Sequence, residues 1–101
     1  MGKLHRIDGP AVEYPNGDKF WCQNGKRHRI DGPAVEYSDG TKHWYQNGAL
    51  HRIDGPAAEY SDGIKRWFIR GVRFETKDAF LEALADEEKS IALFSEVFLN
   101  A

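Results

Sequence analysis

The chain is 101 residues long, with 41% apolar residues, 30% charged residues and a formal net charge of −2. This length predicts one small domain, and the single cysteine, Cys22, excludes an internal disulfide framework and agrees with a reducing compartment. No apolar run approaches the roughly 20 residues that span a bilayer, and the first residues lack the apolar core of a signal peptide, so we expect a cytoplasmic protein.

Residues 5–27, 28–50 and 51–73 form a 23-residue unit written three times, of which the second copy reads HRIDGPAVEYSDGTKHWYQNGAL. A fixed period of this length is typical of repeat proteins, in which each unit buries its apolar face against its neighbours. The three units carry 12 of the Lys and Arg residues against 9 Asp and Glu, including those of the first four residues. We therefore expect a mildly basic repeat body.

Each unit contains glycines seven or eight residues apart, most of them preceded by Asn or Asp. Asn-Gly and Asp-Gly between short apolar runs favour type I′ hairpin turns. In this pattern, residues 42–46 form a strand, Asn47 and Gly48 form a tight turn, and a return strand bends at 54–56 and continues over 57–60. The units therefore predict a mainly β fold, a long antiparallel meander.

The pattern changes where a fourth copy of the unit would begin, at Phe74. Apolar residues then recur with the period of a helix, and Thr76 is placed to act as an N-cap. We expect one or two helices over 77–99, with the acidic stretch at 86–88 either bending the segment or starting a second helix. Residues 1–75 are thus predicted to form the repeat sheet, and residues 76–101 an acidic, apolar helical segment that caps its open end.

Thirteen of the 23 positions are identical in all three units. Their text resembles the MORN-like repeats of bacterial and phage proteins, HRxDGPAxEYxDGxKxWYxNG, over residues 2–73. The resemblance implies an elongated sheet of successive hairpins with no activity of its own, and contacts with proteins or, in some relatives, with membrane lipids. Short chains of this variant also resemble phage accessory proteins, which implies inhibition of a bacterial defence system, for example as an anti-CRISPR protein.

The His-Arg-Ile-Asp-Gly stretch has two interpretations. As a row of cations it would grip phosphates or carboxylates of a partner, and the residues concerned are His5, Arg6, His28, Arg29, His51 and Arg52. As structure, each arginine would brace the aspartate of its own turn or pack its stem on a tryptophan. The structural interpretation is favoured, and the turn residues are then Asp8, Asp31, Asp54, Gly9, Gly32 and Gly55.

The chain offers no catalytic or metal-ligating constellation. Histidines at equivalent points of successive units lie at least two strand spacings apart, roughly 10 Å, and cannot share one metal ion. Cys22 stands where the other units have Tyr45 and Phe68, so it is predicted to be a packing residue. No unit carries a distinctive carboxylate pair. We therefore expect a protein that is not an enzyme and that has neither a metal nor another cofactor.

Aromatic residues are predicted to form the core of the sheet. The core positions are Trp21, Trp44, Trp67, Tyr14, Tyr37 and Tyr60. Consecutive residues of a strand point to opposite faces, so the second aromatic row, which follows each tryptophan, is either covered by the C-terminal helix or left as a binding stripe. Aromatic rings beside lysine and arginine suit single-stranded nucleic acid.

Three functions remain open. In the first, the protein is a non-enzymatic binding module that occupies a surface of another protein, such as a host effector complex in the host-cell cytoplasm. Its contact residues would be the His-Arg row, His43 and Arg66 on the sheet, or the acidic Glu82, Asp86, Glu87 and Glu88 of the C-terminal segment. In the second, the basic aromatic face binds nucleic acid or a nucleotide. In the third, the protein is a scaffold or an antitoxin-like immunity protein; a dimer through the apolar C-terminal helix is a further possibility.

Overall fold

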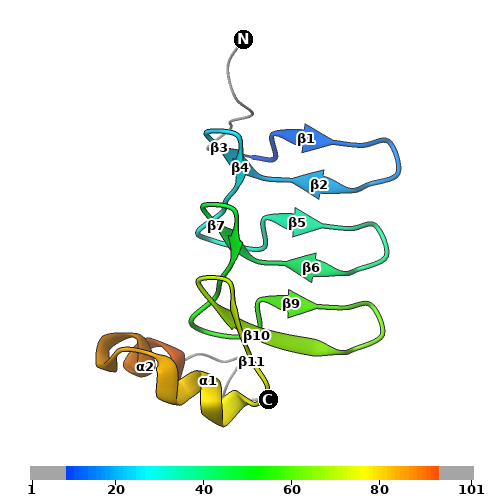
Figure 1. The fold of residues 1–101 in the computed structure, drawn as a ribbon. Helices are drawn as coiled ribbons and strands as arrows, with labels where there is room; N and C mark the ends of the chain where they lie inside the picture. Colours follow the sequence, from blue (N-terminus) through cyan, green and yellow to red (C-terminus); the bar gives the residue numbers. More distant parts are fainter. Residues whose placement is uncertain (1–8, 94–101) are drawn as a thin grey trace.

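The computed structural model describes residues 9–93 and shows a mainly β fold with two short C-terminal helices (Figure 1). The seven-stranded antiparallel sheet has the order β1-β2-β5-β6-β9-β10-β11, and two small hairpins lie outside it. The sheet strands are β1 (Val12–Glu13), β2 (Lys19–Phe20), β5 (Val35–Glu36), β6 (Lys42–His43), β9 (Ala58–Glu59), β10 (Lys65–Ile69) and β11 (Val72–Phe74). The hairpins pair β3 (Cys22–Gln23) with β4 (Lys26–Arg27), and β7 (Tyr45–Gln46) with β8 (Ala49–Leu50). In the part of the chain described, no helix is long and apolar enough to cross a bilayer.

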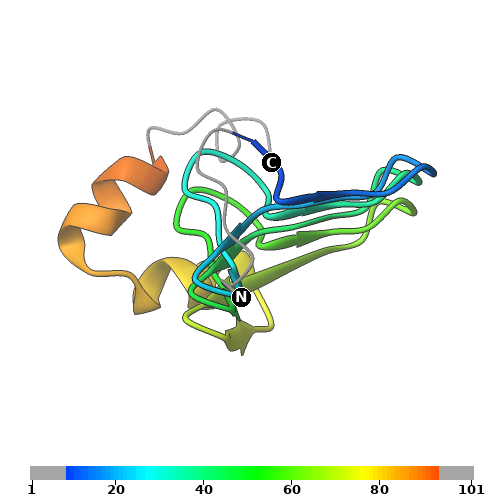
Figure 2. The same cartoon turned by 90° about the horizontal axis from the view of Figure 1, so that it is seen from above.

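The predicted antiparallel meander is confirmed, because the strands of the large sheet follow one another in chain order. Three long hairpins, β1–β2, β5–β6 and β9–β10, stack along the sheet, with their tips on one side and the small hairpins and helices on the other (Figures 1 and 2). Neighbouring hairpins join through pairs of strands, so that Val35 lies opposite Phe20 and Ala58 lies opposite His43. The sheet is therefore continuous across the sequence units.

The Asn-Gly turns of the small hairpins behave as predicted, whereas at the tips of the long hairpins only Gly17, Gly40 and Gly63 have positive φ, so these turns are not type I′. Asn24 and Asn47 both have φ of 51°, and the glycine after each also has positive φ, as a type I′ turn requires. The prediction is wrong for the Asp-Gly-Pro bends, since neither Gly32 nor Gly55 has positive φ. A different constraint, the close approach of an arginine side chain, explains the glycine at these two positions, as described below.

The strand predicted over residues 42–46 is interrupted at Trp44. The backbone N–H of Trp44 donates to the Ala57 carbonyl at 2.7 Å, and its own carbonyl accepts from the His51 N–H at 3.0 Å. These two bonds turn the chain out of the large sheet and into the small hairpin. In the third unit the strand β10 stays continuous, because it pairs first with β9 and then with β11.

The core of the sheet differs from the predicted one. Small apolar residues are its fully buried members, among them Ala34, Val35, Ala57 and Ala58. The tryptophans are half-buried, and the prediction that the tyrosines belong to the core is wrong: Tyr14, Tyr37 and Tyr60 are 53%, 36% and 37% exposed. The strand pairing and alternation place these tyrosines on the same face of the sheet as Phe20 and His43.

The helices cover the last strands of the sheet. Helix α1 (Lys77–Ala83) begins at the predicted N-cap, Thr76, whose Oγ1 accepts from the Ala79 N–H at 3.0 Å. Helix α2 (Asp86–Leu93) starts at the acidic stretch, which therefore does not merely bend the segment. Both helices pack on β10 and β11 through a buried cluster consisting of Ile69, Phe80, Leu84 and Ala92. The part of the helical prediction beyond residue 93 lies outside the described residues.

Candidate binding surface

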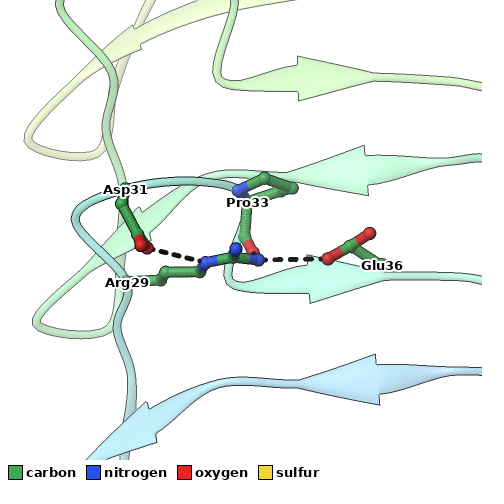
Figure 3. Close-up of polar contacts among 4 residues, drawn as sticks. All are labelled: Arg29, Asp31, Pro33 and Glu36. Carbon is green, nitrogen blue, oxygen red and sulfur yellow. Dashed lines mark hydrogen bonds and ion pairs between the residues drawn. The ribbon is translucent and has the colours of Figure 1, made fainter. Parts of the chain in front are cut away.

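We call the boundaries at which neighbouring hairpins pair, β2 with β5 and β6 with β9, the seams. Arg29 is held at the first seam by residues of its own unit (Figure 3). Its Nε donates to Asp31 Oδ1 at 2.9 Å, and its Nη1 donates to the Pro33 carbonyl and to Glu36 Oε2, both at 3.1 Å. The guanidinium lies 4.0 Å from the ring centroid of Trp21, in the preceding unit. The hydrogen bond from Arg29 lowers the pKa of the Asp31 carboxyl.

Arg52 repeats this arrangement with less exposure, 8%. Its Nε donates to Asp54 at 2.8 Å, its Nη1 donates to the Pro56 carbonyl at 3.2 Å, and its guanidinium lies 3.8 Å from the Trp44 centroid. A Cβ on Gly55 would stand 2.7 Å from Arg52 Cζ, closer than side chains tolerate. The guanidinium thus lies directly over the glycine of the Asp-Gly-Pro bend, and any larger residue at this position would displace it.

The histidine that precedes each of these arginines links neighbouring units. His28 Nδ1 accepts the backbone N–H of Asn47 at 3.0 Å, and His51 Nδ1 accepts that of Arg70 at 2.9 Å. An accepting Nδ1 is unprotonated, so a neutral ring carries its proton on Nε2. Burial and the nearby cation of Arg70 lower the pKa of His51, which favours this neutral form.

Both arginines of the second and third His-Arg stretches, and the Nδ1 atoms of both histidines, thus have partners within the chain. This is the bracing role that the sequence favoured for Arg29 and Arg52. Their role in binding a partner stays a prediction, as does that of His28 and His51. The equivalent residues of the first unit, namely His5, Arg6 and Asp8, lie outside the described residues; Gly9, which follows them, is half-buried.

A row of aromatic rings crosses the face of the long hairpins opposite to that of Glu36, the partner of Arg29. Successive rings meet edge to face, with centroid distances of 5.7, 6.0, 5.9 and 5.5 Å. In order along the sheet the rings belong to Tyr14, Phe20, Tyr37, His43 and Tyr60. The Arg66 guanidinium follows, 5.7 Å from the Tyr60 centroid. We call these six residues the aromatic face.

Two cations border the rings of the aromatic face. Arg27 lies between Phe20 and Tyr45, with its Cζ 5.3 and 5.7 Å from the two centroids. Burial and the charge of Arg27 lower the pKa of His43, whose Nε2 has no hydrogen-bond partner among the described residues; the same holds for Arg66 Nε. Both nitrogen atoms are buried, next to tyrosine rings that are themselves exposed.

The other face of the same strands is a charge ladder. Glutamates and lysines stand opposite one another in strict alternation across the six strands. The ladder consists of Glu13, Lys19, Glu36, Lys42, Glu59 and Lys65. Opposite charges in register stabilise neighbouring strands, and because they balance, this face has no net charge from the ladder. It is the less distinctive of the two faces as a binding surface.

A hollow of about 390 Å³ opens beside the first unit, between the aromatic face and the small hairpins. It is lined by Val12, Tyr14, Phe20, Cys22, Gly25, Lys26, Arg27 and Gly48. Cys22 is 5% exposed, and burial raises the pKa of its thiol. The cysteine is therefore a packing residue, as the sequence predicted, and the hollow combines aromatic walls with two cations.

The acidic residues of the helices do not act together. Glu82 and Asp86 are exposed, whereas Glu88 Oε2 lies 3.4 Å from Arg70 and its Oε1 accepts the Ala85 N–H at 2.9 Å. The side chain of Glu87 lies outside the described part of the structure. Within residues 9–93 no group of three potential metal ligands comes together. Ile91 and Leu93 are 57% and 54% exposed on α2, so their use in a dimer stays a prediction.

No family model, no curated protein and no solved structure matches this chain.

The sequence identified His43 and Arg66 as contact residues but did not predict the exposed row to which they belong. A signal for it is present. The residue before each tryptophan differs between units, being Phe20, His43 and Arg66, although its neighbours Lys and Trp do not change. The variation between two constant neighbours makes this position a candidate for partner-specific contacts.

Proposed function

We propose that this protein is a non-enzymatic binding module, built from three MORN-like repeats, that contacts another protein through the aromatic face. The observation that carries the proposal is the exposed row of Tyr14, Tyr37 and Tyr60, with Arg27 and Arg66 beside rings of the same face. Tyrosine and arginine are enriched where proteins contact one another, because they offer large apolar area together with hydrogen-bond donors. Short strands braced at every seam hold the rings in place before a partner arrives.

The geometry favours a protein partner over nucleic acid. The rings of the aromatic face meet edge to face at 83–90° in three of the four contacts, so the ring faces that bases would stack on are directed at neighbouring rings. The charge ladder on the opposite side is balanced and supplies no cationic track for a phosphate backbone. Nucleic acid remains a second candidate because Arg27 and Arg66 lie beside aromatic rings.

The specific form we favour is a phage-encoded inhibitor that occupies a surface of a bacterial defence complex in the host cytoplasm, such as a CRISPR effector. The support for this form is the resemblance to short MORN-like phage proteins, together with the exposed aromatic face as a contact surface. In this proposal the inhibitor acts by steric occlusion. Its effect on the complex would therefore be reversible and stoichiometric.

Affinity capture from bacterial lysate tests the proposal. The tagged wild-type chain is compared with Tyr37→Ser/Tyr60→Ser, which removes two exposed rings, and with Lys19→Ser/Lys42→Ser, a matched pair on the charge ladder. We expect a stoichiometric protein that survives high salt, that is lost with the tyrosine variant and that is retained by the lysine variant. Equal capture by all three chains would contradict the role of the aromatic face. Recovery of nucleic acid that disappears at high salt would support the second candidate.

A further inference from the structure

The seams between units follow one rule. Where a hairpin pairs with the preceding one, a lysine lies opposite a glutamate and an aromatic residue lies opposite a small apolar one. Between β6 and β9, Lys42 faces Glu59 and His43 faces Ala58. The next residue, Trp44, donates its backbone N–H to the Ala57 carbonyl at 2.7 Å. The same pattern joins β2 to β5. Each strand of the type β5 or β9 is therefore an acceptor for a Lys-aromatic-Trp strand.

Strand β1 is a third acceptor of this type, and no described strand pairs with its outer edge. Among residues 9–93 its only strand neighbour is β2. The Tyr14 N–H donates inward to the Asp18 carbonyl at 2.9 Å, so by alternation the N–H and carbonyl of Glu13 point outward. The Ala11 carbonyl corresponds to that of Ala57, which accepts the tryptophan bond at the internal seam.

The rings of the aromatic face are more exposed toward this edge. Tyr37 meets rings on both sides and is 36% exposed, whereas the ring of Tyr14 meets one other ring among the described residues, that of Phe20, and is 53% exposed. The hollow described above adjoins the same edge, since Val12 and Tyr14 both line it. An aromatic side chain placed opposite Val12 would therefore cover Tyr14 and border the hollow.

We propose that β1 accepts an extended segment of the partner protein as an added antiparallel strand, with a lysine or arginine opposite Glu13 and an aromatic residue opposite Val12. The inference rests on the proposed function, because the added segment is the part of the partner that continues the aromatic face. Main-chain bonds to Glu13 and Ala11 supply affinity, and the two side chains supply register. The internal seams show that this chemistry fits the edge.

A second copy of the chain is the weaker occupant. In a head-to-tail contact β10 would have to supply the strand, but Trp67 already lies opposite Phe74 of β11. The ring centroids of Phe80 in α1 and Trp67 are 5.0 Å apart. Phe80 thus contacts Trp67, whereas the equivalent tryptophans at the seams are contacted by Arg29 and Arg52. A symmetric contact through β1 would set Glu13 opposite either its own copy or Ala11, so no lysine would face it.

The probe is a synthetic peptide of residues 39–46, the segment whose lysine and histidine face β9, titrated into the full-length chain. We expect the backbone amide signal of Glu13 to shift in NMR spectra and its hydrogen exchange to slow. Glu13→Pro removes the outward N–H and should weaken binding about tenfold. Glu13→Lys should weaken it about threefold, and a peptide carrying Lys42→Glu should restore binding to that variant. A scrambled peptide is the control, and circular dichroism shows that each variant is folded.

Absence of peptide binding at millimolar concentration, or equal binding by wild type and both Glu13 variants, would overturn the inference. A dimer in sedimentation velocity that Glu13→Pro disperses, with no peptide binding, would overturn it in favour of a second copy. These results leave the proposed function standing if the tyrosine variant still loses its captured partner. Conversely, peptide binding at β1 together with equal partner capture by the wild type and the Tyr37→Ser/Tyr60→Ser variant would contradict the proposed function and not the edge site.

Discussion

The seams between units and the aromatic face lie on the same strands and are built in opposite ways. At a seam, each arginine is enclosed by a carboxylate, a carbonyl and a tryptophan ring, and Arg52 is 8% exposed. On the aromatic face, polar nitrogens of His43 and Arg66 have no partner in the described chain, and the tyrosines are 36–53% exposed. The arginine, aspartate, proline and tryptophan of the seams are identical in every unit, whereas Phe20, His43 and Arg66 occupy one position with three different side chains.

The 23-residue repeat therefore contains two kinds of position: those that stabilise the fold and those that are candidates for recognition. A seam must present the same geometry each time, so its residues repeat without change. A side chain that points away from the seam is released from that requirement and can be matched to a partner. Internal repetition thus identifies the structural residues, and the departures from it identify the candidates for binding.

The largest expected effect comes from opening a seam. Arg52→Ala removes the stacking on Trp44 and two hydrogen bonds, and leaves the Pro56 carbonyl unpaired in a buried site. We expect a loss of about 3 kcal/mol in the free energy of unfolding, measured by urea denaturation. Arg73→Ala, at an exposed arginine 3.9 Å from Glu75, should cost less than about 0.5 kcal/mol. Equal losses for the two variants would show that the seam is not a stabilising site.

The second effect concerns the glycine below the guanidinium. Gly55→Ala would force Arg52 to move, because the new Cβ would lie 2.7 Å from its Cζ. We expect a loss of about 2 kcal/mol, which should shrink to well under half of that when Arg52→Ala is already present. Gly63→Ala is the control: its φ is +92° and nothing lies within 4 Å, so its cost should be the same with and without Arg52. Additive costs for Gly55 and Arg52 would contradict the close-approach explanation.

The third effect is a pH dependence at the histidine links. The pKa of His51 is lower in the folded chain than its ordinary value of 6.5, because the ring is half-buried and near Arg70. The unfolded chain therefore binds the proton more tightly, so the stability that His51 contributes is complete above pH 6.5 and is lost as the pH falls below that value. Urea midpoints measured between pH 7.5 and 5 should decrease.

His51→Asn sharpens this third prediction, because an amide oxygen can still accept the Arg70 N–H but does not titrate in this range. We expect the variant to retain most of its stability at pH 7.5 and to show a smaller decrease on acidification than the wild type. An unchanged pH slope would assign the dependence to another group.

The smallest effect is expected on the aromatic face. Tyr14→Thr removes one edge-to-face contact, with Phe20, and should cost about 0.5 kcal/mol. Tyr37→Thr removes two such contacts and should cost about 1 kcal/mol. A loss above about 2 kcal/mol for either variant, measured in the same urea titrations, would place the tyrosines in the core and erase the contrast with the seams.

Several of the predictions that the structure confirms depended on local chemistry. The type I′ turns at Asn24 and Asn47, the N-cap at Thr76 and the antiparallel order of strands all follow from short-range preferences. The errors arise where a distant residue decides. The strand is interrupted at Trp44 because its backbone groups bond to Ala57 and His51. The glycine at position 55 is explained by the close approach of Arg52 and not by a turn with positive φ.

The sequence by itself determined the period, the positions of the tight turns and the change to helix after residue 75, because each depends on a few adjacent residues. Only the tertiary structure decided which aromatic row is covered. Alternation along a strand defines two faces but does not say which one meets another layer. Here the small residues at Ala34, Ala57 and Ala58 allow close packing at the seams, and the tyrosines are left on the open side because the helices cover the last strands instead.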